Sequence, residues 1–465
     1  MRRGDPRSPA AANYREKEET AARRYEACLR EPDVAARTAE ALREACRRHG
    51  LVVGGRQLCA VLRPRFLSAE RTEHLARVSA ILAALLERAG AHLLASHRLL
   101  DLIGATEEER DIWSIDPGYP GFTLTSRLDS FMAHDQPRFV EYNAESPAGI
   151  GFCDRLIEVF NELPVTHAWR PDAPPQPADG RRALLEILLA AYRDWGGQDT
   201  PTMAIIDWEN VITRRDFELC AELFREHGVP VTITDPRSLR YVNGTVWCGN
   251  ERITLVYRRV LLPELLAKSA EIQPLLQAYR DGAICMVNSP RSKLLHKKTV
   301  FALLCDRQLG LEMTPAERAV VEQTVPWTRA LLEGSTEYAG QSVDLVHLLL
   351  SQPEQFALKP TDDYGGRGVV LGWDSSPEVW AEAVEQGIVT GGFIVQERVD
   401  VPQELYPVWR DGWLQEETLL LDTNPLLFGG RMGCVLTRLS GSALLNVSAG
   451  AGSAVPTFVL QEERG

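Results

Sequence analysis

A lysine stands shortly before a glycine-rich loop in FALKPTDDYGGRGVVLG, residues 356–372. FALK is typical of an apolar strand, DDYGGRG of a turn and VVLG of a returning strand, and we expect positive φ angles at Gly365, Gly366 and Gly368. Backbone N–H groups at the tip of such a hairpin can close over a triphosphate, while Lys359 on the strand offsets its charge. The P-loop pattern GxxxxGK[ST] before a helix is absent from the sequence. An ordinary surface turn is the alternative.

Composition restricts the partners and the compartment. The chain has 465 residues, enough for two or three domains, and its formal net charge of −13 argues against binding to nucleic acid or to an anionic membrane. The nine cysteines are scattered without a CxxC pair, which fits reduced thiols and neither a disulfide framework nor a zinc site. The N-terminus lacks the apolar segment of a signal peptide, and no run of about 18 apolar residues follows, so we expect a cytoplasmic protein.

The pattern of the chain changes at a linker. Ala and Leu recur at helical spacing before residue 100, which predicts a mainly helical N-terminal region. WRPDAPPQPADG, residues 169–180, is rich in proline and polar residues and is interpreted as a linker. Strands and helices alternate from 200 to 290, which predicts an α/β unit with a parallel sheet, although GxGxxG is missing. From 291 onward we expect a helix, then short strands and glycine-rich turns.

Polar residues alternate along two short strands in RLDSFMAHDQPRFVEYNAESPAG. Side chains two positions apart share one face of a strand, which groups Arg127 with Asp129, and Glu141 with Asn143 and Glu145. Carboxylate and amide oxygens are the ligands that Mg²⁺ prefers, together with phosphate and water. Arg127 beside them can stabilise charge on a phosphoryl group or on a tetrahedral intermediate. A solvent-facing strand edge with an Arg–Asp pair is the alternative.

Two further segments carry residues suited to a nucleotide. Lys297 and Lys298 open the helix in LLHKKTVFALL, where a cation and N-terminal amides can both face phosphate. GGFIVQERV is an apolar strand that ends in Gln396 and Glu397, and the backbone of such a segment can read an adenine edge. Each signal is weak alone, because a lysine on a helix is usually solvated.

Three arginines outside these segments are candidates for binding anions. The run DTNPLLFGGRMGCVLTRLSGSALLNVSAGAGSAVP places Arg438 at the end of an apolar strand and Asn446 before a loop of small residues. We interpret Arg438 as an anion contact and the loop as a wall of the active site, or both as a hairpin with a flexible tail. In VYRRV, Arg258 and Arg259 can hold a substrate carboxylate, and a surface salt bridge is the alternative.

Together these residues resemble the ATP-grasp superfamily in its circularly permuted form, most of all the synthetase domain of glutathionylspermidine synthase. The resemblance covers about 120–450 and rests on the order R-x-D, E-Y-N-A, K, K-P, GGRG and Q-E. In an ordinary ATP-grasp enzyme the magnesium ligands follow the lysine and the glycine loop, whereas here they precede them. Glu145 departs from the family, which usually has Asp at this position.

The resemblance implies an α/β (α+β) fold, with a permuted ATP-grasp core, a pre-ATP-grasp α/β domain and a helical N-terminal region. The implied boundaries are 1–100 for the N-terminal region, 101–180 for the metal-ligand part and linker, 181–290 for the substrate domain and 291–465 for the nucleotide-binding lobes.

The resemblance also implies a role for each candidate residue. Two Mg²⁺ ions would be bound by Asp129, Glu141 and Asn143. Arg127 would stabilise the transferred phosphoryl group and the intermediate. Arg438, interpreted above as an anion contact, is the second catalytic candidate. The phosphates of ATP would be contacted by Lys298 (Lys297 fits less well), Lys359, Gly365, Gly366, Arg367 and Gly368. The adenine would be bound by Gln396 and Glu397. The resemblance does not locate the substrate contacts, and the candidates for them in this sequence are Glu145, Ser146 and Arg259.

The implied reaction is an ATP-dependent ligation of a small-molecule carboxylate to an amine, through an acyl phosphate. It needs no protein nucleophile, which fits the lack of a Ser–His or Cys–His arrangement. The alternatives are an ATP-dependent small-molecule kinase and a non-catalytic nucleotide-binding protein. The expected partners are small molecules, without nucleic acid or membrane, and a homodimer is a further expectation. The resemblance does not identify the acid or the amine.

Overall fold

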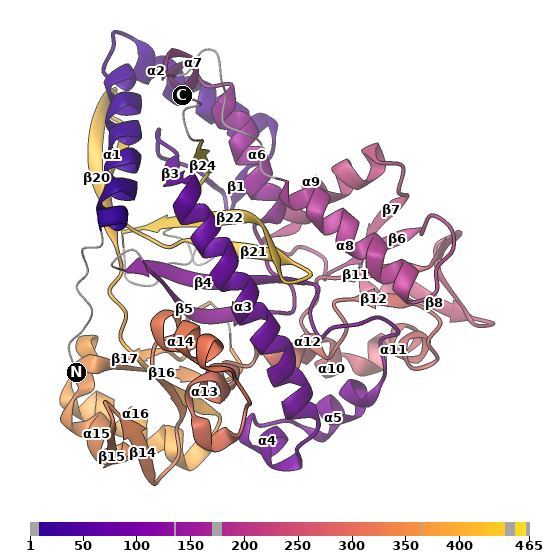
Figure 1. Ribbon diagram of the computed structural model, residues 1–465. Coiled ribbons are helices and arrows are strands. Elements are labelled where there is room, and N and C mark those ends of the chain that lie inside the picture. Colours follow the sequence, from indigo (N-terminus) through magenta and orange to yellow (C-terminus); the bar gives the residue numbers. More distant parts are fainter. Residues whose placement is uncertain (1–8, 134–135, 170–178, 364, 442–451, 462–465) are drawn as a thin grey trace.

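An antiparallel sheet lies at the centre of the computed structural model, which describes residues 9–133, 136–169, 179–363, 365–441 and 452–461. Its strands are β4 (Thr125–Ala133), β5 (Gln136–Asn143), β19 (Gln403–Arg410), β20 (Trp413–Leu421), β21 (Asn424–Phe428), β22 (Arg431–Ser440) and β23 (Gly452–Val455). The order is β19-β20-β22-β21-β4-β5, with β23 paired to β22. Purple β4 and β5 thus lie beside yellow β21 and β22, although they are far apart in the sequence (Figure 1).

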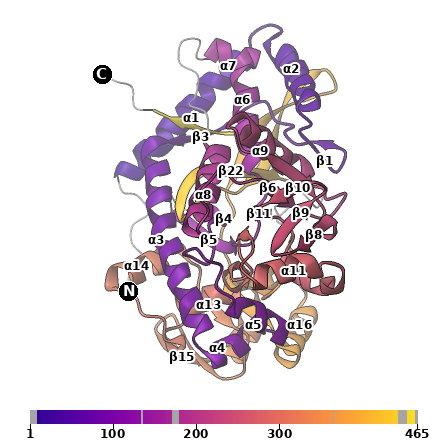
Figure 2. The same ribbon diagram turned by 90° about the vertical axis from the view of Figure 1, so that its right-hand side faces the viewer.

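The long helix α3 (Ala69–Leu94) packs on one face of this sheet, against β21 and β22 (Figure 1 and Figure 2). It begins after Ser68, whose hydroxyl accepts a hydrogen bond from the backbone N–H of Arg71. Its buried residues recur at helical spacing and include Leu75, Val78, Leu82, Leu86, Ala89 and Leu93. This apolar stripe and the sheet share one hydrophobic core.

Strand alternation separates the apolar and polar faces of β4 and β5. Leu128 and Tyr142 are Cα partners across the two strands, and both are buried in the core beside α3. Their neighbours Asp129 and Glu141 are also partners, so their side chains leave the sheet on the other face. The predicted grouping of polar residues across two strands is confirmed for Asp129 and Glu141, whereas Glu145 lies beyond the end of β5.

A parallel sheet occupies one side of the molecule. Its strands are β6 (Met203–Ile206), β7 (Val231–Thr234), β11 (Leu255–Arg258) and β12 (Cys285–Val287), in the order β12-β11-β6-β7. All three pairings are parallel, as predicted for residues 200–290. The helices of this unit are α8 (Gly180–Asp194), α9 (Arg214–Glu226), α10 (Leu262–Ala267) and α11 (Gln273–Arg280). A small antiparallel sheet, β8 (Leu239–Val242), β9 (Thr245–Cys248) and β10 (Glu251–Ile253), is inserted between β7 and β11.

A second antiparallel sheet lies at the other side and carries the glycine loop. Its strands are β13 (Thr328–Ala330), β16 (Phe356–Pro360), β17 (Val370–Leu371) and β18 (Phe393–Glu397), in the order β13-β18-β16-β17. The accompanying elements are α12 (Ser292–His296), α13 (Thr299–Cys305), α14 (Pro315–Thr324), α15 (Leu345–Ser351), α16 (Pro377–Thr390) and the hairpin of β14 (Ser335–Tyr338) and β15 (Gln341–Asp344). Leu349, Phe356 and Trp380 belong to a hydrophobic core of their own in this lobe.

The first part of the chain packs against its last part. The elements are α1 (Pro9–Leu29), α2 (Val34–Arg48), β1 (Val52–Val53), β2 (Arg56–Gln57), β3 (Arg65–Ser68), α6 (Ile150–Asn161), α7 (Pro164–Trp169) and β24 (Thr457–Leu460). The helices α4 (His97–Leu102) and α5 (Glu107–Ser114) belong instead to the core beside α3. β3 pairs with β24 in parallel, and Tyr25, Leu42, Phe66 and Phe458 share one core. The helical N-terminal segment is therefore joined to the end of the chain.

Some predicted features are short or lie outside the description. Short 3-10 helices lie at Pro236–Ser238, Ser269–Glu271, Arg307–Leu309, Pro353–Gln355 and Gly372–Asp374. Most of the predicted linker, residues 170–178, and the loop with Asn446, residues 442–451, lie outside the described residues. Within the described ranges, none of the helices combines the length and the apolar character needed to cross a membrane. All nine cysteines are free.

The contact between α6 and α9 leaves no room for a side chain at Gly151. A Cβ atom there would overlap the backbone oxygen of Asp216 and lie 2.9 Å from Cβ of Leu219. We expect Gly151→Ala to lower the free energy of unfolding by about 1–3 kcal/mol, the usual range for overpacking. Denaturant unfolding checks this value. Gly441→Ala is the matched control, because a Cβ there meets nothing within 4 Å, and an equal loss in both variants would contradict the explanation.

Candidate active site

A cavity of about 1020 Å³ lies where the two antiparallel sheets and the parallel sheet meet. Most of the residues predicted from the sequence line it. They are Arg127, Asp129, Glu141, Asn143, Ser146, Arg259, Lys298, Lys359, Gly365, Gly366, Arg367, Gln396, Glu397 and Arg438. Glu145 and Gly368 are the predicted residues that are not part of its lining. Segments far apart in the sequence are thus brought to one place.

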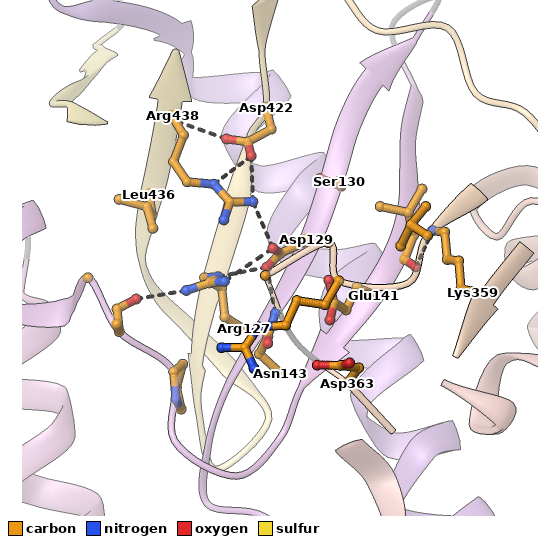
Figure 3. A pocket seen from close by; sticks show the side chains of 18 of the residues that line it. Arg127, Asp129, Ser130, Glu141, Asn143, Lys359, Asp363, Asp422, Leu436 and Arg438 are labelled. Atoms are coloured by element: carbon orange, nitrogen blue, oxygen red, sulfur yellow. Dashed lines mark hydrogen bonds and ion pairs between the residues drawn. The ribbon is translucent and has the colours of Figure 1, made fainter. Parts of the chain in front are cut away.

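Asp129 is held between two arginines at the centre of this cavity (Figure 3). Arg127 donates from Nε to Oδ1 at 2.6 Å and from Nη2 to Oδ2 at 3.1 Å, and Arg438 donates from Nη2 to Oδ2 at 2.7 Å. The amide of Asn143 donates to Oδ1 at 3.0 Å. Burial alone would raise the pKa of Asp129, but the charges of Arg127 and Arg438 outweigh burial and hold it well below its usual range.

Asp422 fixes Arg438, and sequence reasoning missed it. Nε and Nη2 of Arg438 lie 2.7 and 2.6 Å from Oδ2 of Asp422, and the backbone N–H of Arg438 donates to Oδ1 at 2.8 Å. Asp422 stands in the turn between β20 and β21, directly after the apolar run LLL. A charged residue directly after an apolar run at the end of a strand is the signal that could have marked it. The predicted role of Arg438 as an anion contact is compatible with its place beside Asp129.

Two lysines face the opposite side of the carboxylate cluster. Lys298 Nζ lies 3.2 Å from Oε1 of Glu141 and also donates to the backbone oxygen of Asp363 at the start of the glycine loop. Lys359 Nζ donates to Oε1 of Gln396 at 2.6 Å. Burial, assisted by the nearby charge of Lys298, lowers the pKa of Lys359 to about 8, although Glu141 opposes the change. Lys298 and Lys359 therefore bring positive charge to one wall of the cavity.

Lys297 does not share this wall. Its ammonium lies 3.0 Å from Oε2 of Glu109 and 3.4 Å from Oδ2 of Asp362, and it is buried outside the lining. The predicted helix is interrupted here, because Lys297 has an extended backbone that separates α12 from α13. The two neighbouring lysines therefore point to different surroundings, which favours Lys298 as the one that contacts a ligand.

The glycine loop has the predicted backbone. Gly365, Gly366 and Gly368 have φ angles of 70°, 77° and 66°, and β16 and β17 pair on either side of the loop. Gly368 packs against Pro360 instead of lining the cavity, since a Cβ atom there would lie 2.7 Å from Cγ of that proline. The strand–turn–strand prediction is confirmed, while the cofactor-binding role of Gly368 can only be indirect.

Gln396 supports a lysine in this structure. Besides accepting from Lys359, its side chain donates to Oγ1 of Thr328 at 3.0 Å, and its backbone lies between β13 and β16. The carbonyl oxygen and the NH₂ group of this amide therefore both have hydrogen-bond partners within the protein. Glu397 and the following residues, 398–401, line the cavity. A contact with adenine would lie on this segment and not on the amide of Gln396.

The oxygen ligands expected for magnesium lie together. Asp129 and Glu141 are partners across β4 and β5, and Asn143 is the partner of Arg127. Within the described ranges, no group of three or more His, Cys, Asp or Glu residues is arranged to hold a metal ion. Mg²⁺ is commonly bound by one or two carboxylates together with substrate phosphates and water. Two carboxylates and an amide, beside a wall that carries Lys298 and Lys359, fit an ion of this kind.

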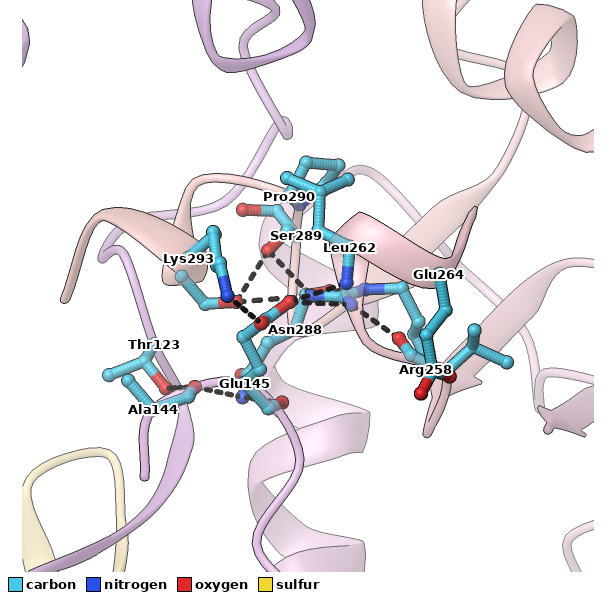
Figure 4. Close-up of polar contacts among 12 residues, drawn as sticks. Thr123, Ala144, Glu145, Arg258, Leu262, Glu264, Asn288, Ser289, Pro290 and Lys293 are labelled. Atoms are coloured by element: carbon cyan, nitrogen blue, oxygen red, sulfur yellow. Dashed lines mark hydrogen bonds and ion pairs between the residues drawn. The ribbon is translucent and has the colours of Figure 1, made fainter. Parts of the chain in front are cut away.

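Glu145 is a correction to the predicted substrate contacts. β5 ends at Asn143, and the carboxylate of Glu145 lies inside the protein with no exposed surface. It accepts hydrogen bonds from Arg258 Nη1 at 3.0 Å and from the backbone N–H of Leu262 at 2.9 Å, and Lys293 Nζ lies 3.3 Å away (Figure 4). Because these groups enclose the carboxylate, it is a structural residue that a substrate does not reach.

Arg258 and Arg259 are buried, so the surface salt bridge considered for them is wrong. Arg258 is 0% exposed and Arg259 is 6% exposed. Arg258 belongs to the Glu145 cluster, whereas Arg259 and Ser146 line the cavity. Their positions leave Arg259 and Ser146 as candidates for substrate contact.

Other residues of the lining were not found from the sequence. They include Asp207, Thr213, Glu264, His296, Asp363 and Asp422. Burial, together with the charges of Lys293 and Lys298, lowers the pKa of His296 to about 4, so this imidazole is neutral near pH 7. Asp207 directly follows strand β6, and this position at the carboxyl end of a parallel strand could have marked it.

A likeness to a solved structure shows the fold. A glutathione synthetase-like effector from Globodera pallida has a TM-score of 0.60 with this chain, at 11% sequence identity. The likeness covers 93% of this chain and 98% of that chain. At this identity it establishes a shared mixed α/β fold and no more.

Two relatives from Frankia share part of the sequence. A protein of Frankia alni, named as a candidate glutamate–cysteine ligase 2-3, is 28% identical over 248 residues, which is 50% of this chain and 27% of that protein. Another of Frankia casuarinae, named as a candidate glutamate–cysteine ligase 2-2, is 27% identical over 68% of this chain and 36% of that protein. The match spans about a third of each relative or less, so their names do not assign a reaction to the shared part. No protein-family model matches the sequence.

The Glu145 cluster yields a prediction for stability. Removing the charge of Glu145 leaves Arg258 and Lys293 buried beside a neutral group, so we expect Glu145→Gln to cost about 3–5 kcal/mol of unfolding free energy. Burial alone would raise the pKa of Glu145, but Lys293 and Arg258 lower it to about 2 from the ordinary 4.5. Its contribution to stability is therefore complete above pH 4.5 and is lost as the pH falls toward 2.

Unfolding measured between pH 3 and pH 7 checks both statements. The free energy of unfolding of wild-type protein should fall more steeply below pH 4.5 than that of the Glu145→Gln variant. Glu44→Gln is the control, because Glu44 forms only an exposed pair with Arg47. Equal stability of Glu145→Gln and wild-type protein at pH 7 would contradict the structural role of Glu145.

Proposed function

We propose that the protein is an ATP-dependent carboxylate–amine ligase with a circularly permuted ATP-grasp core. The observation that carries this proposal is Asp129, which two arginines hold in one cavity with Glu141, Asn143 and two lysines. Such a cavity offers oxygen ligands for a cation on one side and positive charge for phosphate on the other. The mixed α/β fold shared with a glutathione synthetase-like effector is consistent with it.

The order of the elements supports the permuted arrangement. β4 and β5, with Asp129 and Glu141, come before the lysines in the sequence, yet β4 pairs with β21, which follows the lysines. The strands that carry the carboxylates and the glycine hairpin therefore line the same cavity, although the hairpin comes much later in the sequence. The closer resemblance to glutathionylspermidine synthase, the domain boundaries and a homodimer stay predictions.

ATP would lie between the carboxylate cluster and the lobe of the glycine loop. Lys298 and Lys359 would offset the charge of its phosphates, and the backbone of Gly365 and Gly366 would face them from the hairpin. The adenine would pack along residues 397–401, which continue the same wall. Asp129, Glu141 and Asn143 would hold Mg²⁺, which neutralises phosphate charge when it is bound.

The proposed reaction has two steps. A carboxylate oxygen of the acid attacks the γ-phosphorus of ATP, the bond to ADP breaks, and an acyl phosphate forms. The nitrogen of the amine then attacks the acyl carbon, phosphate leaves, and an amide results after loss of a proton. Arg127 and Arg438 offset the negative charge that develops at the transferred phosphoryl group and at the tetrahedral centre. The glycine hairpin would exclude water, which otherwise hydrolyses the acyl phosphate.

Release of ADP with defined pools of small molecules tests this function. We expect ADP only when a carboxylate pool and an amine pool are both present, and mass spectrometry should detect an amide product. ADP with the acid pool alone, without a condensed product, would identify a kinase. Binding of ATP without ADP from any pool would leave a non-catalytic nucleotide-binding protein.

Asp129→Asn tests the assignment of the carboxylate cluster. The variant keeps the size of the side chain but loses the charge that faces Arg127 and Arg438, so we expect ADP release to fall by about a hundredfold or more. Asn143→Ala should show a similar loss while it leaves Asp129 with both arginines. The measurement is the rate of ADP release at saturating ATP, with circular dichroism to verify folding.

Asp199→Asn is the matched control for these variants, because Asp199 is exposed and outside the cavity. Wild-type turnover in folded Asp129→Asn would remove Asp129 from the catalytic site.

A further inference from the structure

The carboxyl end of the parallel sheet forms one wall of the cavity. β6 and β11 are neighbours, with Ile206 paired to Arg258, and each strand is followed directly by a charged residue. These residues are Asp207 and Arg259, and the backbone N–H of Arg259 donates to the oxygen of Ile206 at 2.9 Å. Both side chains line the cavity that contains Asp129. Ligands of open α/β sheets are commonly bound at this edge.

Arg259 is a buried cation that lacks an ion-pair partner within the described part of the chain. Its Nη1 donates to the backbone oxygen of Pro147 at 2.7 Å and to the hydroxyl of Tyr257 at 3.2 Å. Its Nε is buried without a hydrogen-bond partner among the described residues. Only 6% of the residue is exposed. A guanidinium held in this way is fixed in position and retains donors for a carboxylate.

Asp207 supplies the opposite charge beside it. Its Oδ1 accepts a hydrogen bond from the backbone N–H of Trp208 at 2.8 Å, and the carboxylate has no salt bridge within the ranges that the structure describes. Asp207 and Arg259 each follow one member of the paired residues Ile206 and Arg258, so they are neighbours at the same edge of the sheet. The deeper Asp216 differs, because it accepts from the backbone N–H groups of Gly149 and Phe152. Asp207 is therefore a carboxylate at this wall that a ligand can reach, and Glu264 also lines the cavity.

We propose that this wall binds the amino-acid head group of the amine substrate, with its carboxylate on Arg259 and its ammonium group beside Asp207. The proposal rests on the proposed function, since it names the substrate class of the same cavity. A polyamine fits this wall poorly, because a second ammonium group would face Arg259. The amine substrate is thus an amino acid or a short peptide with a free carboxylate.

Binding to the full-length protein tests the head group without turnover. The probes are individual L-amino acids and glycylglycine, their C-terminal amides, their N-acetyl derivatives and spermidine, each titrated by calorimetry with and without a non-hydrolysable ATP analogue. We expect at least one zwitterionic probe to bind, and its amide and its N-acetyl form to bind about tenfold more weakly or worse. Spermidine binding that equals or exceeds that of every zwitterion would overturn the proposal.

Single substitutions test the charges of Arg259 and Asp207 one at a time. Arg259→Gln should weaken the zwitterion by about tenfold or more and leave its C-terminal amide unchanged, with partial recovery in Arg259→Lys. Asp207→Asn should weaken the zwitterion and leave the N-acetyl form unchanged. In turnover, both variants should raise KM for the amine and not KM for ATP. Arg252→Gln is the matched control, because Arg252 is exposed on β10.

The outcomes distinguish this proposal from the ligase function. Charge-dependent binding of a zwitterion without ADP release in any pool supports the head-group site and contradicts the ligase. ADP release that requires an amine without a carboxylate supports the ligase and overturns the head-group site. Should Arg259→Gln fail to fold, Asp207→Asn alone decides, and unchanged affinity for the zwitterion in that variant would overturn the proposal.

Discussion

One buried carboxylate joins the three sheets around the cavity. Glu145 lies two residues after the end of β5 in the central sheet, and Arg258 ends a strand of the parallel sheet. Lys293 lies in α12, the helix that leads into the lobe of the glycine loop. Lys293 also contacts Asp362 at the base of the glycine loop. Burying such charges is costly, and an ion pair of this kind contributes more to a defined arrangement than to net stability. Here the defined arrangement is the relative position of the walls that form the cavity.

Charge at the cavity differs from the charge of the whole chain. The formal net charge is −13, yet Arg127, Arg259, Lys298, Lys359 and Arg438 all line the cavity. Three of the five contact a carboxylate of the same cavity: Arg127 and Arg438 are paired with Asp129, and Lys298 with Glu141. A bound cation that competed for Asp129 and Glu141 would release these positive groups toward phosphate. The site is thus balanced in isolation and suited to a ligand that brings both a cation and an anion.

Local patterns predicted most of the site, and long-range packing determined the rest. Alternation in RLD and EYN identified the side chains on one face, because a strand repeats every two residues. The same alternation failed at Glu145, since β5 ends at Asn143 and the chain then turns toward Arg258. Asp422 and Asp207 were missed because their role depends on partners far away in the sequence. The pairing of β3 with β24 could not be predicted for the same reason, since it joins the two ends of the chain.

Adjacent residues at the end of β11 connect the lining of the cavity to the buried Glu145 cluster. Arg258 points into the buried Glu145 cluster, while Arg259 lines the cavity. Since consecutive side chains of a strand leave on opposite faces, fixing Arg258 also fixes the direction of Arg259. Arg258 is tied through Glu145 to Lys293, and Lys293 is tied to Asp362 beside the glycine loop. A ligand on Arg259 and a phosphate under the loop would therefore be positioned by one set of buried charges.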